Sequence, residues 1–233
     1  FRTASTVFGV GILLVLVYAL GFRPIDTPPQ IYKAPDLRQE TGAMQTAVST
    51  DRKTQLELGE YQGVDCIRAK DGLLYAAAWN GAALKKRTSD LVRTDGGHAA
   101  AILSVEGELT GFAFDAAGDV WLTQLTTAGG TLCRAKHDSW GAAVEQVVTQ
   151  LDGAPLGAVS AVEVSPAGKV YFAVAAAAGA ENGLESALRT ELLAHTATGC
   201  VYVYDPAART VEKVLGGVAG AAGLALSPDG STL

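Results

Sequence analysis

The chain has 233 residues, of which 48% are hydrophobic and 18% charged, and 18 basic against 24 acidic side chains give a net charge of −6. This composition is typical of a globular protein and excludes a disordered one. No basic stripe runs along the sequence, so we expect no nucleic-acid partner. Cys66, Cys133 and Cys200 form no C-x-x-C pair, and we expect small buried side chains instead of metal ligands.

Residues 1–23 contain an uninterrupted apolar run, VFGVGILLVLVYALGF, from Val7 to Phe22. About 20 apolar residues span a bilayer, and the run is just long enough when the uncharged residues before it are included. It predicts a single transmembrane helix, with the membrane as a partner. We expect a location in the endoplasmic reticulum or plasma membrane, with the rest of the chain lumenal or extracellular. The A-L-G tripeptide at 19–21 also suits signal cleavage, which would give a secreted protein.

The next segment, residues 24–55, is polar and rich in proline. Such chain is extended and semi-rigid, so the segment predicts a stalk between the anchor and a folded domain. A helical pattern lies near Leu37–Val48.

Residues 56–233 change to short β-type runs separated by turns rich in glycine and aspartate. Four strand–turn–strand units have their turn glycines at Gly72, Gly118, Gly168 and Gly230, spaced by 46, 50 and 62 residues. A hairpin that recurs near this period is typical of propeller blades, whereas a β-sandwich, the alternative, has more evenly spaced strands. We therefore predict an all-β fold, a β-propeller, with two-residue turns in these hairpins.

About three and a half blades fit between Leu56 and Leu233, if each blade also contains a second strand pair such as the one after Gly199. An open half-propeller would expose a long unpaired edge. The chain also starts without Met and stops just after a turn, so we expect the missing blades beyond Leu233. Residues 175–194 interrupt the pattern and predict an insertion that is helical around Leu184–Leu193.

Five motifs in this domain resemble those of the strictosidine synthase-like family. They are G-V-D at 63–65, A-F-D with G-D-V-W at 113–121, G-K-V-Y-F at 168–172, T-G with V-Y-D-P at 198–206, and G-L-A-L-S-P-D-G at 223–230. The resemblance implies a six-bladed propeller. It also implies a relationship to gluconolactonases and paraoxonases, which hydrolyse esters and lactones with a calcium ion on the propeller axis.

The resemblance places the family's axial ligand positions on five residues of this chain. Asp65 keeps a carboxylate, Ser160 replaces an asparagine, and Ala222 replaces another asparagine with no ligand atom at all. Val174 and Gln124 stand where relatives carry aspartates. Calcium takes several oxygen ligands, so these losses weigh against tight cation binding and metal-assisted hydrolysis.

The sequence therefore favours a membrane-anchored strictosidine synthase-like propeller with a degenerate metal site and a binding or scaffold role, with protein partners or a small ester or lactone as ligand. Two alternatives remain: a calcium-dependent esterase or lactonase that coordinates its metal through Asp65 and residues beyond Leu233, and a structural subunit of a membrane assembly. No catalytic residue is assigned. His98, His137 and His195 lie too far apart in the sequence for a metal motif, and the three tryptophans are expected in the core or at blade edges.

Overall fold

The computed structural model describes residues 11–15, 17–18, 59, 61–81, 84–95 and 98–233. The predicted stalk and most of the predicted anchor lie outside these residues, while 11–15 and 17–18 are helical. In the part of the chain that is described, no helix is both long and apolar enough to cross a membrane. All strands belong to one compact unit, Gln55–Leu233.

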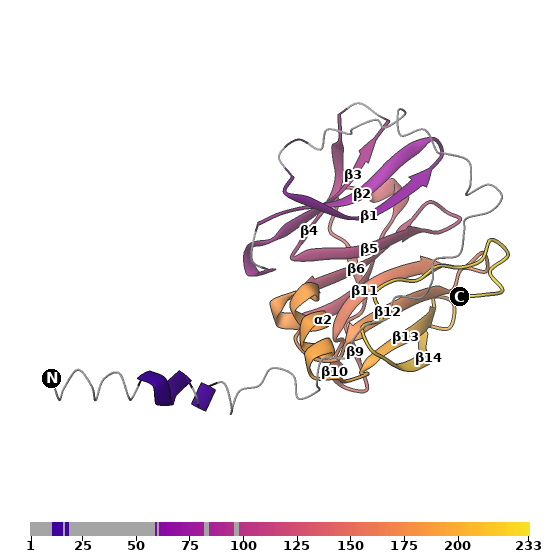
Figure 1. Ribbon diagram of the computed structural model, residues 1–233. Coiled ribbons are helices and arrows are strands. Elements are labelled where there is room, and N and C mark those ends of the chain that lie inside the picture. Colours follow the sequence, from indigo (N-terminus) through magenta and orange to yellow (C-terminus); the bar gives the residue numbers. More distant parts are fainter. Residues whose placement is uncertain (1–10, 16, 19–58, 60, 82–83, 96–97) are drawn as a thin grey trace, which may run out of the picture. The chain divides into compact units, whose positions relative to one another are not determined.

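This unit is all-β, with three four-stranded antiparallel sheets arranged as propeller blades, as predicted (Figure 1). Blade 1 contains β1 (Gly63–Lys70), β2 (Leu73–Asn80), β3 (Thr88–Thr94) and β4 (Ala100–Glu106). Blade 2 contains β5 (Glu108–Phe114), β6 (Val120–Thr126), β7 (Gly129–Ala135) and β8 (Glu145–Val148). Blade 3 contains β11 (Ala158–Val164), β12 (Val170–Ala176), β13 (Gly199–Asp205) and β14 (Thr210–Val218). A two-stranded sheet, β9 (Gln150–Leu151) and β10 (Ala154–Pro155), lies between blades 2 and 3 in the sequence.

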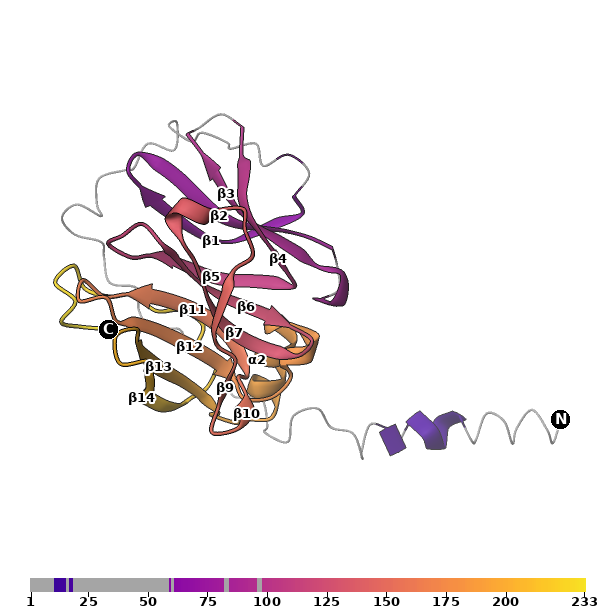
Figure 2. The same cartoon turned by 180° about the vertical axis from the view of Figure 1, so that it is seen from behind.

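The first strand of each blade, β1, β5 or β11, is the innermost, and β5 packs against both of the others. Figure 2 shows from behind that the three blades follow one another in a fan. Arg68 of β1 ties the three inner strands together. Its Nε donates to the carbonyl oxygen of Phe112 at 2.5 Å, and one terminal nitrogen reaches the carbonyl of Val162 at 3.2 Å and the carboxylate of Glu163 at 2.7 Å.

Blade 2 is buried on both faces because blades 1 and 3 pack against it. In β6, Val120 and Leu122 pack towards Tyr75 and Leu91 of blade 1. Trp121 and Leu125, on the other face of β6, belong to a second core shared with blade 3. Strand side chains point to opposite faces in turn, so a strand between two blades has an almost continuous apolar run.

The turns explain why the hairpins form where they do. Asp71 and Gly72 have φ of 51° and 77°, the backbone that a two-residue D-G hairpin turn requires. The prediction of two-residue turns was wrong for blades 2 and 3, where five-residue loops, 115–119 and 165–169, connect the strands. Asp115 closes the first of these loops, since its carboxylate accepts from the N–H groups of Ala117 and Asp119.

The predicted helix of the insertion is confirmed as α2 (Leu184–Leu193), preceded by the short 3-10 turn η5 (Ala180–Asn182). The insertion begins later than predicted, because residues 175 and 176 complete β12. The hairpin predicted around Gly230 has its turn, closed by the Ser227 N–H and the Thr232 carbonyl at 2.8 Å. Leu224–Leu226 form no strand, because no partner strand pairs with them in the described residues. The described residues thus form three complete blades and the turn of a further hairpin.

All three cysteines are free, and Cys133 and Cys200 are buried as predicted. Cys66 is only half-buried. The 3-10 turns η3 (Leu84–Lys86) and η4 (His137–Ser139) connect strands within blades 1 and 2.

Candidate binding cleft at the inner strands

Three of the five predicted ligand positions come together at the inner strands. Asp65 of β1, Ser160 of β11 and Ala222, which follows β14, line one groove of about 330 Å³, together with Thr110 of β5. The strand pairing shifts register at or beside these residues in all three inner strands. Such bulges bend a strand and redirect side chains, often beside functional sites.

The other two predicted positions do not line this groove. Val174 is 5% exposed and belongs to the core between blades 2 and 3. Gln124 is buried in β6, where its amide nitrogen donates to the Glu106 carbonyl at 2.8 Å and its oxygen accepts from the Cys133 thiol at 3.4 Å. Both side chains are buried in contacts between neighbouring blades, so neither is a candidate ligand.

The groove does not fit the calcium ion that the family resemblance implies. Asp65 is its only carboxylate. The Ser160 hydroxyl donates to the Ala221 carbonyl at 2.5 Å, and the Thr110 hydroxyl donates to the Thr123 carbonyl at 3.1 Å. Calcium takes six to eight oxygen ligands. Across the described parts of the chain, no group of three or more His, Cys, Asp or Glu residues is placed to hold a metal.

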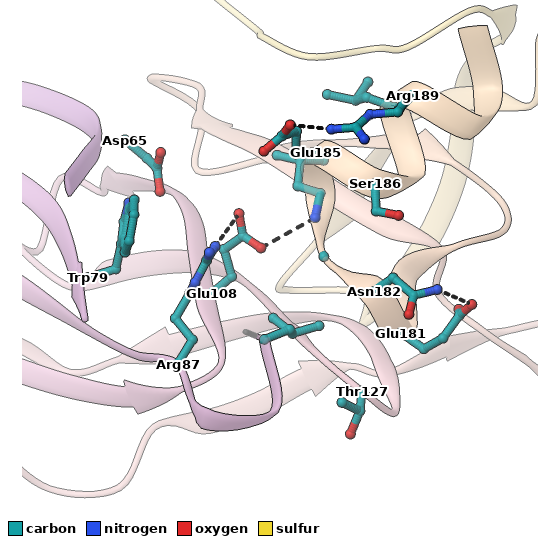
Figure 3. A pocket seen from close by; sticks show the side chains of 14 residues that line it. Asp65, Trp79, Arg87, Glu108, Thr127, Glu181, Asn182, Glu185, Ser186 and Arg189 are labelled. Carbon is teal, nitrogen blue, oxygen red and sulfur yellow. Dashed lines mark hydrogen bonds and ion pairs between the residues drawn. The ribbon is translucent and has the colours of Figure 1, made fainter. Parts of the chain in front are cut away.

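A larger cleft of about 740 Å³ adjoins the groove, and Asp65 and Leu184 border both. Blades 1 and 2 form one wall and the insertion forms the other (Figure 3). Its charged and aromatic lining consists of Asp65, Trp79, Arg87, Glu108, Glu181, Glu185 and Arg189. The prediction of a core or blade-edge position for Trp79 was therefore incomplete, because this half-buried ring also faces the cleft.

Glu108 lies at the centre of this arrangement and was missed by sequence reasoning. It is 7% exposed, and its carboxylate pairs with the Arg87 guanidinium at 3.2 Å and accepts from the Leu184 N–H at 3.3 Å (Figure 3). Burial raises the pKa of Glu108, and the nearby carboxylates of Asp65 and Glu185 add to the rise, while Leu184 and Arg87 oppose it. One signal was available: a glutamate that opens the otherwise apolar E-L-T-G-F-A-F strand.

Asp65 and Trp79 lie side by side in this wall. Partial desolvation raises the pKa of Asp65, although the Arg87 charge and the neighbouring Trp79 indole act in the opposite direction. The Arg87 guanidinium lies over the Trp79 ring, 4.5 Å from its centroid. Arg87 thus contacts both Trp79 and Glu108, and its charge is already engaged.

The cleft has a surplus of negative charge. Arg87 pairs with Glu108, and Arg189 pairs with Glu185 at 2.6 Å. Neither Asp65 nor Glu181 takes part in an ion pair with any described residue. A cleft with excess carboxylates beside an aromatic ring attracts positively charged groups.

No protein-family model matches this chain, and no curated protein matches it either. Among solved structures, a candidate gluconolactonase is 16% identical with a TM-score of 0.47, and the match covers 72% of this chain and 58% of that one. The nidogen/laminin complex matches at 13% identity and a TM-score of 0.41, over 63% of this chain and 44% of that one. PorZ of Porphyromonas gingivalis also has 13% identity, with a TM-score of 0.38 and 19% of its length covered. The chain therefore spans less than two thirds of each, and similarity at this level does not identify chemistry.

Proposed function

We propose that this chain is part of a strictosidine synthase-like propeller that binds a small polar ligand carrying positive charge. The binding site is the cleft between blades 1 and 2 and the insertion. The observation that carries the proposal is the surplus of carboxylates: among the described residues, Asp65 and Glu181 line the cleft without an ion-pair partner. Because the Arg87 guanidinium already lies over the Trp79 ring, we expect the carboxylates to hold an ammonium group.

The alternative, a calcium-dependent esterase or lactonase, receives less support from the same residues. Metal-assisted hydrolysis needs a cation that polarises the carbonyl and activates water. The inner-strand groove offers one carboxylate and two hydroxyls, fewer side-chain oxygens than the six to eight ligands that calcium takes.

Calorimetric titration of the full-length protein tests this proposal, with spermidine and choline as cationic probes and citrate and glycerol as anionic and neutral ones. We expect at least one cation to bind and citrate and glycerol not to bind. Asp65→Asn should weaken the cation about fivefold to tenfold at low salt, which corresponds to about 1 kcal/mol. Glu212→Gln, on the exposed face of β14, removes the same charge and should change nothing. Citrate binding, or equal affinities for Asp65→Asn and the control, would contradict the proposal.

We also propose that the full-length protein is attached to a membrane of the secretory pathway. The support is the apolar run from Val7 to Phe22, which has the length and composition of a membrane span. Fractionation of cells expressing the full-length protein tests it. The protein should stay in the membrane pellet at alkaline pH, and deletion of residues 7–22 should release it. Recovery of the intact protein in the soluble fraction would overturn the attachment.

A further inference from the structure

The insertion forms a whole wall of the cleft. Leu184, Glu185, Ser186, Leu188 and Arg189 of α2 line it on one side, opposite the side chains of blades 1 and 2 (Figure 3). The position of α2 therefore determines how accessible the cleft is.

The C-terminal end of α2 is held firmly by a buried glutamate of its own. Glu191 is 4% exposed, and its carboxylate accepts from the Thr196 hydroxyl at 2.7 Å, the Thr198 N–H at 2.5 Å and the Thr198 hydroxyl at 2.8 Å. The Thr198 hydroxyl in turn accepts from the Ala177 N–H at 3.0 Å. These bonds join the end of α2 to both strands from which the insertion departs. Despite burial, these hydrogen bonds hold the pKa of Glu191 below its ordinary value, so it stays ionised.

The N-terminal end of α2 is joined to the blades by one side-chain hydrogen bond. Gly183 stands at the N-cap and offers no side-chain cap, and the Leu184 N–H donates to Glu108, which comes from another blade. Beneath this end, the small side chains of Ala180 and Ala187 are buried, and Leu184 packs against the same core. Gly179, with φ of 83°, and Gly183, with φ of 95°, flank η5 and give the backbone two positions that tolerate unusual angles.

We propose that α2 is a cover for the cleft, hinged at Glu191 and latched at Glu108. When the contact between Glu108 and Leu184 breaks, η5 and the first turns of α2 move away from the blades while the Glu191 end stays in place. The latch is poised because Glu108 combines opposing effects. Arg87 and Leu184 stabilise its charged form, while burial and the neighbouring carboxylates Asp65 and Glu185 destabilise it. The movement of α2 itself does not depend on the proposed binding function. Only its role in controlling access of a ligand to the cleft rests on that function.

Hydrogen exchange measured by mass spectrometry on the full-length protein tests the cover without any ligand. In Glu108→Ala, the amides of residues 184–188 should exchange about tenfold faster, the equivalent of about 1.4 kcal/mol. The amides of β13 should exchange at the same rate as in the control variant, Glu212→Ala. Glu108→Gln keeps an acceptor for the Leu184 N–H and should increase the exchange rate of residues 184–188 by less. This variant replaces Glu108→Ala in the test if the alanine variant does not fold. Glu191→Ala should instead speed exchange at residues 194–199 as well as in α2.

Two results would overturn the cover. One is exchange in residues 184–188 of both Glu108 variants that equals the Glu212→Ala control. The other is acceleration spread evenly over blades 2 and 3, which would make Glu108 a general support of the fold. If residues 194–199 of Glu191→Ala exchange as slowly as in the unmodified protein, Glu191 does not act as the hinge. If the exchange rates change as expected but neither spermidine nor choline binds, the proposed cover is supported and the proposed class of ligand is wrong.

Discussion

Arg68 shows how one side chain can connect three blades. It leaves β1, crosses β5 at the Phe112 carbonyl and ends on Val162 and Glu163 of β11. The two partners of the ion pair are 30% and 15% exposed, so water screens the pair only in part. Hydrogen bonds to charged groups contribute more than neutral ones, and an orphaned buried charge is costly. Arg68 therefore stabilises the packing of the blades.

Replacing Arg68 with methionine should lower the free energy of unfolding by about 1–3 kcal/mol, because two carbonyls and Glu163 lose their donor. Urea denaturation of the full-length protein measures this. The double variant Arg68→Met/Glu163→Gln should be less destabilised than the sum of the single variants, since no charge is left unpaired. Arg93→Met, at an exposed position of β3, should change stability by less than about 0.5 kcal/mol. Equal stabilities for Arg68→Met and Arg93→Met would refute the role of Arg68.

Asp65 gives cation binding a defined dependence on pH. Its pKa is raised by desolvation, so protonation removes the negative charge at a pH above the ordinary aspartate value of about 3.9. Affinity for spermidine should therefore fall as the pH is lowered, earlier than an unperturbed aspartate would allow. In Asp65→Asn this part of the pH dependence should disappear. Affinity that rises on acidification, or an unchanged profile in the variant, would argue against Asp65 as the recognition group.

At the scale of elements, close approach between blades depends on glycine at particular positions. A Cβ on Gly130 would lie 2.3 Å from the Gly157 carbonyl oxygen and 2.7 Å from a methyl group of Val159. Neither the backbone of residue 157 nor the buried side chain can withdraw easily, since both belong to the packed contact between blades 2 and 3. The space at this contact is therefore sized for a residue without a side chain.

Gly130→Ala should lower the free energy of unfolding by about 1–3 kcal/mol through overpacking. The matched control is Gly223→Ala, where the added methyl group would meet nothing within 4 Å and φ is not positive. Thermal unfolding of the full-length protein gives the comparison, with a lower melting temperature expected for the first variant alone. A melting temperature for Gly130→Ala equal to that of the control would show that the contact between these blades is looser than described.

Local patterns predicted the elements well and the cleft only in part. Alternation and turn residues are local signals, and they predicted the first hairpin of each blade, the second strand pair of blade 3 and the helix at Leu184–Leu193. The grouping of Asp65, Ser160 and Ala222 came from the family resemblance and not from the local pattern. The roles of Glu108 and Arg87 in the cleft could not be predicted in this way. Glu108 pairs with Arg87 and bonds to the Leu184 N–H, and these residues are far apart in the sequence. Val174 and Gln124 were misplaced because neighbouring strand residues alternate between faces and depths.

At the scale of the whole molecule, the fold permits many functions, and the residues near the axis decide among them. A propeller brings one inner strand from each blade to the axis, so a calcium site there requires oxygen ligands from several blades at once. In the described blades only blade 1 supplies a carboxylate to the groove, and Ala222 supplies no ligand atom. The larger cleft depends instead on the insertion, which provides half of its wall and the proposed cover.

The most direct test of this account compares the melting temperature of the full-length protein in about 1 mM calcium with that in a chelator, a concentration at which even weak extracellular calcium modules bind. For a site with a dissociation constant of about 10 μM, this concentration is about 100 times the dissociation constant, which stabilises the folded state by about 2.7 kcal/mol and shifts melting by several degrees. We predict no difference beyond about 1 °C, because blades 1 to 3 bring a single carboxylate to the groove. A rise of several degrees with calcium, absent in Asp65→Asn, would establish a cation site and contradict the account.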